Sequence, residues 1–279
     1  MRVRAQLLIL LSFLAAVAAT AGDKEPTYEG RSLSEWLHEL DPHLMYEVHH
    51  PPPEIVAIRQ IGTNALPLLL KWMAAKDPPE APKPHLAACF NMTRSERAAM
   101  AISILEETAS PAIPELTRLA MSLPNRDRYD LCIKALADIG PESLPSFIAI
   151  LTEGTPGRRF SAIEWLPVFH TNAAVALPAV IKCLAGKDEE LGWKAADELS
   201  RLEIPSNTVV HALTNALATA RAPARARILR CLYWLNAPAR DAVPAIRAGL
   251  SDPSSEVRTN AIYAAQRIAP ELLTNAPPK

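Results

Sequence analysis

The sequence predicts an all-α protein in which short antiparallel helix pairs stack one on another, the architecture of an α-solenoid. Apolar residues recur at helical spacing in short segments that turn residues separate. One helix-pair pattern also returns with a period of 33 residues, which is typical of repeat architectures. The composition, with 49% hydrophobic residues and only 9 glycines, agrees with this fold class.

The clearest copy of the pattern is residues 241–270. Pro244 lies in the first turn of a helix, where its missing N–H and fixed φ are tolerated. Residues 251–254, Ser-Asp-Pro-Ser, end that helix with turn chemistry and can cap the next one. Each helix carries one apolar stripe, formed by Val243, Ile246 and Leu250 in the first and by Val257, Ala261, Ile262, Ala265 and Ile268 in the second. Neither helix can bury its stripe alone, so the unit needs neighbours.

The neighbours appear at the same period upstream. The last apolar position of the first helix is occupied in successive units by Leu151, Leu184, Leu217 and Leu250. The corresponding positions of the second helix are occupied by Ala162, Ala195, Ile228 and Ala261, and four residues further on by Leu166, Leu199, Leu232 and Ala265. These registers predict a continuous solenoid over residues 54–270.

At these residues the chain resembles the HEAT-repeat family, in the short form similar to bilin-lyase HEAT-like repeats. The shared pattern is P-x-I/L, L-x-D-P and V-R-x-x-A-x-x-A, and only residues 241–270 match it nearly in full. Gly192 stands where the pattern has arginine, and His211 stands where it has proline. The resemblance implies a right-handed superhelix with the first helices on its convex side and the second helices on its concave side.

The N-terminus predicts export. Arg2 and Arg4 precede an apolar run from Leu7 to Ala19, and Ala-Thr-Ala at 19–21 suits signal peptidase, so residues 1–21 are interpreted as a signal peptide. The expected location is periplasmic or extracellular, without membrane insertion after cleavage. An uncleaved N-terminal membrane anchor is the alternative.

Residues 22–53 are expected to form an N-terminal cap helix followed by an irregular loop. Ser32 and Glu35 form a capping box that predicts a helix from about Leu33 to Leu40. The stretch from Tyr28 to Leu37 resembles the opening of exported bacterial HEAT-repeat proteins, Y-x-G-[KR]-x-L-x-x-W-L. A Pro-rich insertion is expected at 76–93 and a short tail at 271–279.

The four cysteines form no C-x-x-C pair and are expected to be free thiols. Those in repeat helices are expected to be buried, as cysteines commonly are. They are Cys89, Cys132, Cys183 and Cys231.

The sequence contains no G-x-S-x-G, phosphate-loop or H-E-x-x-H motif, so we expect no enzyme, no catalytic residue and no cofactor. The only His-Glu dipeptide, His38-Glu39, cannot supply the several His-Glu pairs of a di-iron hydroxylase of this repeat type. Six potential metal ligands gather in two irregular segments without ligand spacing, and we interpret them as solvent-facing rather than as a zinc site. They are His43, Glu47, His49, His50, His85 and Cys89. A net charge of −1 gives no general attraction for nucleic acid.

One stripe of each second helix faces away from the apolar stripe and is predicted to line the concave side. Large aromatic residues on it, mixed with charge, favour an interaction face for a protein or peptide. Its predicted binding residues are Phe160, Glu164, Trp193, Asp197, Arg230, Tyr233 and Tyr263, and its other positions are Pro167, Ser200, Ala226, Thr259 and Gln266. The alternative interpretation is that these rings pack against adjacent repeats.

Three functions remain open from the sequence. The first is an exported, non-enzymatic scaffold that binds a protein or peptide on the concave face. The second is an enzyme or ligand carrier with a site formed by segments 41–53 and 76–93, and the third is a structural spacer of the cell envelope. Trp165 and Trp234 are expected to be structural, and Arg159, Arg225 and Arg258 are expected to form a ladder that bonds neighbouring repeats.

Overall fold

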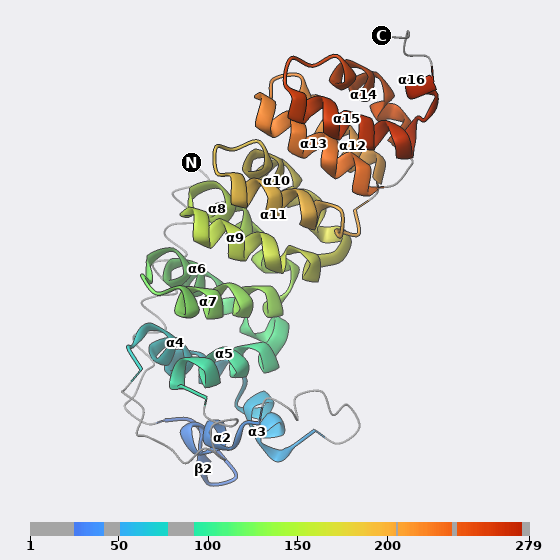
Figure 1. Ribbon diagram of the computed structural model, residues 1–279. Helices are drawn as coiled ribbons and strands as arrows, with labels where there is room; N and C mark the ends of the chain where they lie inside the picture. Colours follow the sequence, from blue (N-terminus) through green and yellow to red (C-terminus); the bar gives the residue numbers. More distant parts are fainter. Residues whose placement is uncertain (1–24, 42–50, 78–91, 205, 236–238, 275–279) are drawn as a thin grey trace, which may run out of the picture. The chain divides into compact units, whose positions relative to one another are not determined.

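The computed structural model describes residues 25–41, 51–77, 92–204, 206–235 and 239–274. The chain divides into two compact units, Met1–Leu119 and Ala120–Lys279, which are described separately. Figure 1 shows the order of the elements along the chain. The predicted signal peptide and most of the Pro-rich insertion lie outside the described residues.

Unit 1 contains a short hairpin and a set of short helices. Its strands pair antiparallel, with Thr27 opposite Ser32 and Tyr28 opposite Arg31. The elements are β1 (Thr27–Tyr28), β2 (Arg31–Ser32), α2 (Leu33–Glu39), α3 (Pro53–Ile61), η1 (Gly62–Ala65), α4 (Leu66–Ala74), α5 (Arg94–Leu105), η3 (Glu106–Ala112) and the first part of α6 (Ile113–Ser122).

Unit 2 contains only helical elements among its described residues, and α6 crosses into it. They are α7 (Arg126–Ile139), η4 (Pro141–Ser143), α8 (Leu144–Glu153), α9 (Pro156–Trp165), η5 (Leu166–Ala176), α10 (Leu177–Leu184), α11 (Glu189–Leu199), α12 (Ser206–Leu217), α13 (Ala222–Leu235), η6 (Ala239–Ala242), α14 (Val243–Leu250), α15 (Ser255–Ile268) and α16 (Glu271–Thr274).

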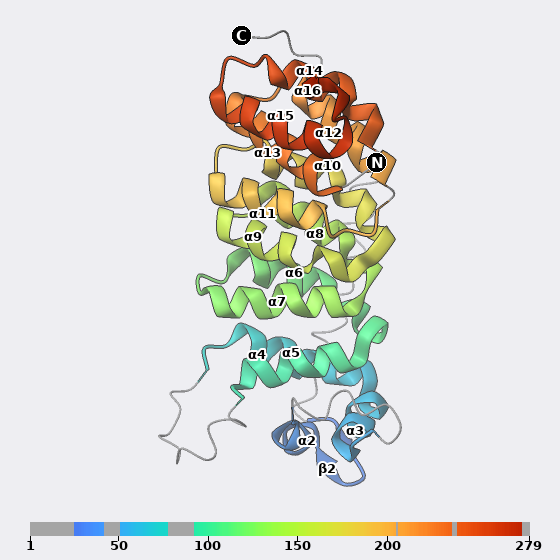
Figure 2. The same cartoon turned by 45° about the vertical axis from the view of Figure 1, so that its right-hand side comes forward.

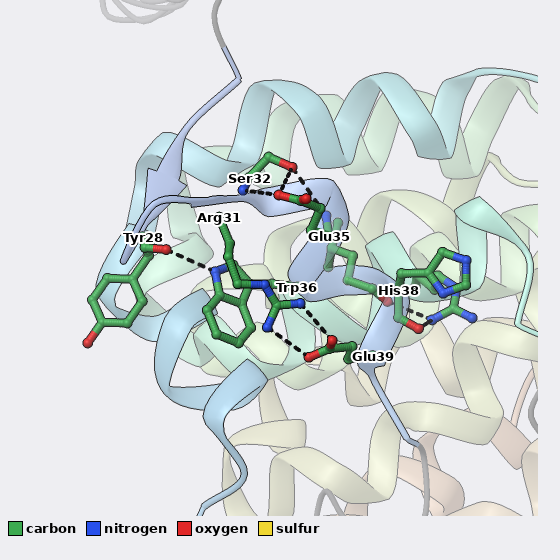
Figure 3. A network of polar contacts seen from close by, with 9 residues as sticks. Tyr28, Arg31, Ser32, Glu35, Trp36, His38 and Glu39 are labelled. Carbon is green, nitrogen blue, oxygen red and sulfur yellow. Dashed lines mark hydrogen bonds and ion pairs between the residues drawn. The ribbon is translucent and has the colours of Figure 1, made fainter.

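The hairpin is joined to α2, which lies where the sequence predicts a helix from about Leu33 to Leu40 (Figure 3). The capping box is present, because Ser32 Oγ accepts from the Glu35 amide and the Glu35 carboxylate accepts from the Ser32 amide. Trp36 Nε1 donates to the Tyr28 carbonyl at 3.2 Å, and the Arg31 guanidinium lies 3.9 Å from the centre of the Trp36 ring. Arg31 also donates two hydrogen bonds to the Glu39 carboxylate, which lower the pKa of Glu39. These contacts hold the hairpin and α2 together, and α2 also contacts α3 and α5.

The repeat pairs of unit 2 are in contact with one another in two rows. Each first helix contacts its own second helix, as in the pairs α8–α9, α10–α11, α12–α13 and α14–α15. The second helices α7, α9, α11, α13 and α15 contact one another in that order, and α10 contacts both α8 and α12. Figures 1 and 2 both show α9, α11, α13 and α15 as successive layers. These contacts bury the apolar stripes that the sequence predicts, including Ala162, Ala195, Ile228 and Ala261.

One tight turn recurs where a second helix ends and the next first helix begins. It places one residue at positive φ, and glycine occupies it at Gly62 (59°) and Gly140 (111°). Glu106 and His170 take the same conformation at φ 49°, which is unfavourable for a residue with a Cβ. Because glycine occupies only two of these four turns, the sequence does not reveal that the same turn recurs.

The predicted all-α class is confirmed, since the described residues form helices apart from the two-residue strands β1 and β2. Some details differ. The tail expected at 271–279 begins with the short helix α16, and the two strands were not predicted. Ile262, which the sequence assigns to the apolar stripe of its helix, is 40% exposed.

Three of the four cysteines, Cys132, Cys183 and Cys231, are free and buried, as expected. Burial, together with the nearby negative charge of Asp197, raises the pKa of the Cys231 thiol to about 12, so it stays protonated. Cys89 lies outside the described residues.

Among the described residues, one helical stretch, Pro156–Leu184, is long and apolar enough to pass for a membrane span on length and composition alone. It consists of α9, η5 and α10, and the positive φ of His170 breaks its backbone. The stretch is therefore three short elements rather than one continuous helix.

Candidate interaction surface

The structure places all seven predicted binding residues on second helices of unit 2, and each has at least a partly exposed side chain. Trp193 is 39% exposed and Tyr263 is 43% exposed, which is unusual for rings of this size. Phe160, Arg230 and Tyr233 are half-buried, and Glu164 and Asp197 are exposed. The structure brings five of these residues together in two groups, and Trp193 and Asp197 belong to neither.

The first group joins α9 to α11 through Lys194. Its ammonium lies 3.3 Å from Glu164, 3.0 Å from Glu198 and 5.2 Å from the centre of the Phe160 ring. Burial alone would lower the pKa of Lys194, but the two carboxylates raise it above its ordinary value, so the residue is protonated. Asp197 is paired instead with Arg201 at 3.0 Å. The cation of this group is therefore neutralised within the protein.

The second group lies on α13 and α15, and we call its five residues, Arg230, Tyr233, Trp234, Tyr263 and Arg267, the arginine–aromatic cluster. The Tyr233 ring packs edge-on against Trp234, with ring centres 5.0 Å apart, and lies 6.4 Å from Tyr263. The Arg230 guanidinium lies 5.7 Å from the Trp234 ring, and that of Arg267 lies 5.0 Å from the Tyr233 ring. Such cation–π contacts hold both partners in place.

The helix α13 positions this cluster because its other side is fully buried. Ile228, Leu229, Cys231 and Leu232 are 0% exposed, so residues 230, 233 and 234 are left on the outer side. On α15 the buried residues Val257, Ala261, Ala264 and Ala265 leave Tyr263 and Arg267 outside in the same way. The cluster follows from the apolar periodicity of both helices.

Two expectations about this surface are wrong. Ala226 is fully buried rather than exposed, because α13 is packed against α11, α12 and α15 and is therefore covered on more than one side. Trp234 is 48% exposed and belongs to the cluster rather than to the core. Sequence reasoning also missed Lys194 and Arg267, although each lies 34 residues after the ring that it contacts, which is one position more than the repeat period.

The expected arginine ladder is also largely wrong. Arg225 does reach the next helix pair, where it donates two hydrogen bonds to the Asp252 carboxylate at 2.8 and 2.9 Å. Arg159 and Arg258 instead bond carbonyl groups of their own inter-helix turns, at Thr152 and at residues 252–253.

Other arginines carry the link between repeats. Arg158 on α9 donates to the carbonyls of Ala120 and Leu123 at the end of α6. In unit 1, Arg97 on α5 donates to the carbonyls of Leu37 and His38 at the end of α2. Each of these guanidinium groups satisfies carbonyl oxygens that a helix end leaves unpaired, one repeat back along the chain.

Arg227 makes the third link of this type and is the most deeply buried. Its side chain is 2% exposed and donates to the carbonyls of Leu184 and Gly186, at the end of α10, at 2.9 Å each. Gly192 leaves the space that this guanidinium occupies, since a Cβ there would lie 2.5 Å from Arg227 Nε. Gly192 therefore does not simply replace a lost arginine. Because glycine has no side chain, it leaves the space that Arg227 of the next helix pair occupies.

The alternative site, at segments 41–53 and 76–93, contains few described residues. His43, Glu47, His49, His50, His85 and Cys89 all lie outside them. At the ends of the insertion, the Asp77 carboxylate accepts a hydrogen bond from the Ser95 amide at 3.0 Å, which joins the two ends. The described residues contain no group of three or more potential metal ligands.

Two exposed histidine–carboxylate pairs also occur in unit 2, His170 with Glu203 and His211 with Asp241. Each pair lies at the surface, with side chains that are more than half exposed. Neither has a nucleophile within hydrogen-bond distance among the described residues, so neither resembles a catalytic arrangement.

Comparison with known proteins gives no assignment: no family model matches the sequence, and a search of curated proteins found no significant match.

Proposed function

We propose that this chain is an exported α-solenoid of HEAT-like helix pairs that binds a protein or peptide through the outer side of its second helices. The observation that carries the proposal is a row of solvent-accessible rings on three successive second helices: Trp193 on α11 and Tyr263 on α15 are exposed, and Tyr233 on α13 is half-buried. Tryptophan, tyrosine and arginine are the residues in which protein-binding energy concentrates.

The ordered contacts of α7, α9, α11, α13 and α15 support the solenoid part of this proposal. In such an array each pair rests on its neighbours, and one side of every second helix remains available to a ligand. The resemblance of residues 241–270 to HEAT repeats and the apolar run at 7–19 support the remaining parts.

The two alternatives have weaker support. A spacer needs no exposed tryptophan, whereas Trp193 makes no aromatic or cation–π contact among the described residues and Trp234 is nearly half exposed. An enzyme or carrier built from the irregular segments would use residues outside the described part of the chain. The observations on unit 2 therefore favour binding.

The proposal is tested by capture of a partner from an envelope extract of the native cells, with the tagged full chain as bait. Replacing Trp193 and Tyr233 together by alanine is expected to abolish capture, because two of the three rings of the row are lost. The control is Val168→Ala with Val175→Ala, two exposed apolar residues of η5 in the same unit, which should leave capture unchanged. Circular dichroism should show equal helicity for all three proteins.

A second variant separates the alternatives. Replacing His49, His50 and Cys89 together is expected to leave capture intact. Loss of capture in this variant, with full capture by the Trp193 and Tyr233 variant, would contradict the proposal and favour the enzyme or carrier.

A further inference from the structure

The exposed ring of Trp193 lies in an acidic part of the chain, and this charge restricts the partner that the ring can take. Trp193 is 39% exposed on α11, and its ring has no aromatic or cation–π contact within the described residues. Residues 188–203 hold six acidic and two basic side chains, although the whole chain carries a net charge of −1. The excess of negative charge is therefore local to α11 and its ends.

Two carboxylates, Glu189 and Glu190, lie on the same side of α11 as Trp193. They precede it by four and three residues, the spacings that make side chains neighbours on a helix surface. A long side chain on a helix leans toward the turn before it, which for Trp193 is the turn of Glu189 and Glu190. All three residues are exposed, and we call them the tryptophan–glutamate patch.

The carboxylates of the patch are available to a partner. Among the described residues, neither takes part in an ion pair or a side-chain hydrogen bond. The two basic residues of the same stretch are engaged elsewhere, because Lys194 pairs with Glu164 and Glu198, and Arg201 pairs with Asp197. The patch therefore combines an open ring with unpaired negative charge.

This combination suits a basic side chain, and arginine in particular. A cation over the face of an aromatic ring is attracted by the ring electrons, and tryptophan gives the strongest attraction. A planar guanidinium stacks on such a ring and directs the N–H groups along its edge at a carboxylate, whereas an ammonium group acts as a point charge.

We infer that the tryptophan–glutamate patch binds an arginine side chain of a partner protein segment. The inference rests on the proposed function and names the chemistry of its partner. The guanidinium lies on the Trp193 ring and donates hydrogen bonds to Glu189 or Glu190. The rest of the segment continues over α13, which packs against α11 (Figure 2).

Other charged partners fit the patch less well. Nucleic acid and anionic membranes present dense arrays of phosphate, which the two carboxylates repel. A free quaternary ammonium ion is typically bound by several rings together. The Phe160 ring on the neighbouring helix α9 already lies between two cations of the protein, 5.7 Å from Arg126 and 5.2 Å from Lys194. One open ring favours a cation that belongs to a longer segment, whose other side chains add contacts.

The test is fluorescence anisotropy of the full chain with three labelled 12-residue peptides. All three carry leucine and phenylalanine at the same positions, and the residues between are arginine, its neutral isostere citrulline, or glutamate. The arginine peptide is expected to bind at least ~10-fold more tightly than the citrulline peptide, because hydrogen bonds between charged groups are stronger than neutral ones. The glutamate peptide should bind weakest, and added salt should reduce the differences.

Variants assign the preference to the patch. Glu189→Gln with Glu190→Gln should lower the affinity for the arginine peptide to about that for the citrulline peptide, which itself should change little. Trp193→Ala should weaken both peptides, since both side chains stack on the ring. The matched control is Glu142→Gln with Glu153→Gln, which removes two exposed carboxylates of the same unit outside the second helices and should change neither affinity. Circular dichroism should show equal helicity for all these proteins.

Equal affinity for the arginine and citrulline peptides would overturn the inference, and so would an equal loss of arginine-peptide affinity in the control variant. Tighter binding of a labelled oligothymidine 12-mer or of phosphatidylglycerol vesicles than of the arginine peptide would also overturn it. If the preference for arginine is absent while capture from extract still depends on Trp193 and Tyr233, the arginine partner is wrong and the binding function stands. If both fail, the proposed function falls with it.

Discussion

Replacing Arg227 by alanine is expected to lower the free energy of unfolding by about 2–4 kcal/mol, because it leaves two carbonyl groups unsatisfied in a buried site and opens a cavity. The arginine is 2% exposed and bonds the carbonyls of Leu184 and Gly186. Arg227→Lys keeps the charge but cannot span both oxygens, so we expect an intermediate loss. Urea denaturation followed by circular dichroism measures both.

Substitutions at Gly192 test the same contact from the other side. In the native background, Gly192→Ala should lower the free energy of unfolding by about 1–3 kcal/mol, because the new Cβ would lie 2.5 Å from the hydrogen-bonded Arg227 side chain. In the Arg227→Ala background the same change should be neutral or stabilise by up to ~1 kcal/mol, since alanine is the better helix former. An equal penalty in both backgrounds would mean that the two residues do not interact. Gly192→Arg, which the arginine ladder predicts to be harmless, should be worse than Gly192→Ala.

Leu184→Ala is expected to destabilise the protein by about 2–5 kcal/mol, as is usual for a leucine removed from a closely packed core. Leu184 is 0% exposed, at the end of α10. Leu217 holds the same place in the repeat but is half-buried, so Leu217→Ala should cost less, under about 2 kcal/mol. The same denaturation experiment compares them, and a larger loss at Leu217 would contradict the described packing of α12.

The helix pairs could be predicted because several local signals agree. The capping box at Ser32 and Glu35, proline in the first turn of α4, α8, α10 and α14, and regularly spaced apolar residues all mark the same boundaries. The turns with Glu106 and His170 could not be predicted, because their conformation favours glycine and neither residue is glycine. There the surrounding packing imposes the backbone that the local sequence disfavours.

The surface could be predicted in part. The stripe opposite the apolar positions located the exposed rings of Trp193 and Tyr263 and the half-buried ring of Tyr233 correctly, because each of these second helices buries its apolar positions. It failed at Ala226, which is buried because α13 contacts helices on more than one side, and at Trp234, which is 48% exposed near the end of α13. The contact between Arg227 and Gly192 could not be predicted, because the two residues belong to different helix pairs and the pattern within one pair does not reveal it.

The most direct measurement of the central claim is site-specific photo-crosslinking in the native cells. A benzophenone amino acid is placed in the full chain at Trp193 or Tyr263, on the row of exposed rings, or at Val175, which is 61% exposed on η5. The account predicts that Trp193 and Tyr263 give the same discrete crosslinked protein partner and that Val175 does not. Crosslinking of that partner at Val175, with none at either ring position, would contradict the claim that the second helices form the binding surface.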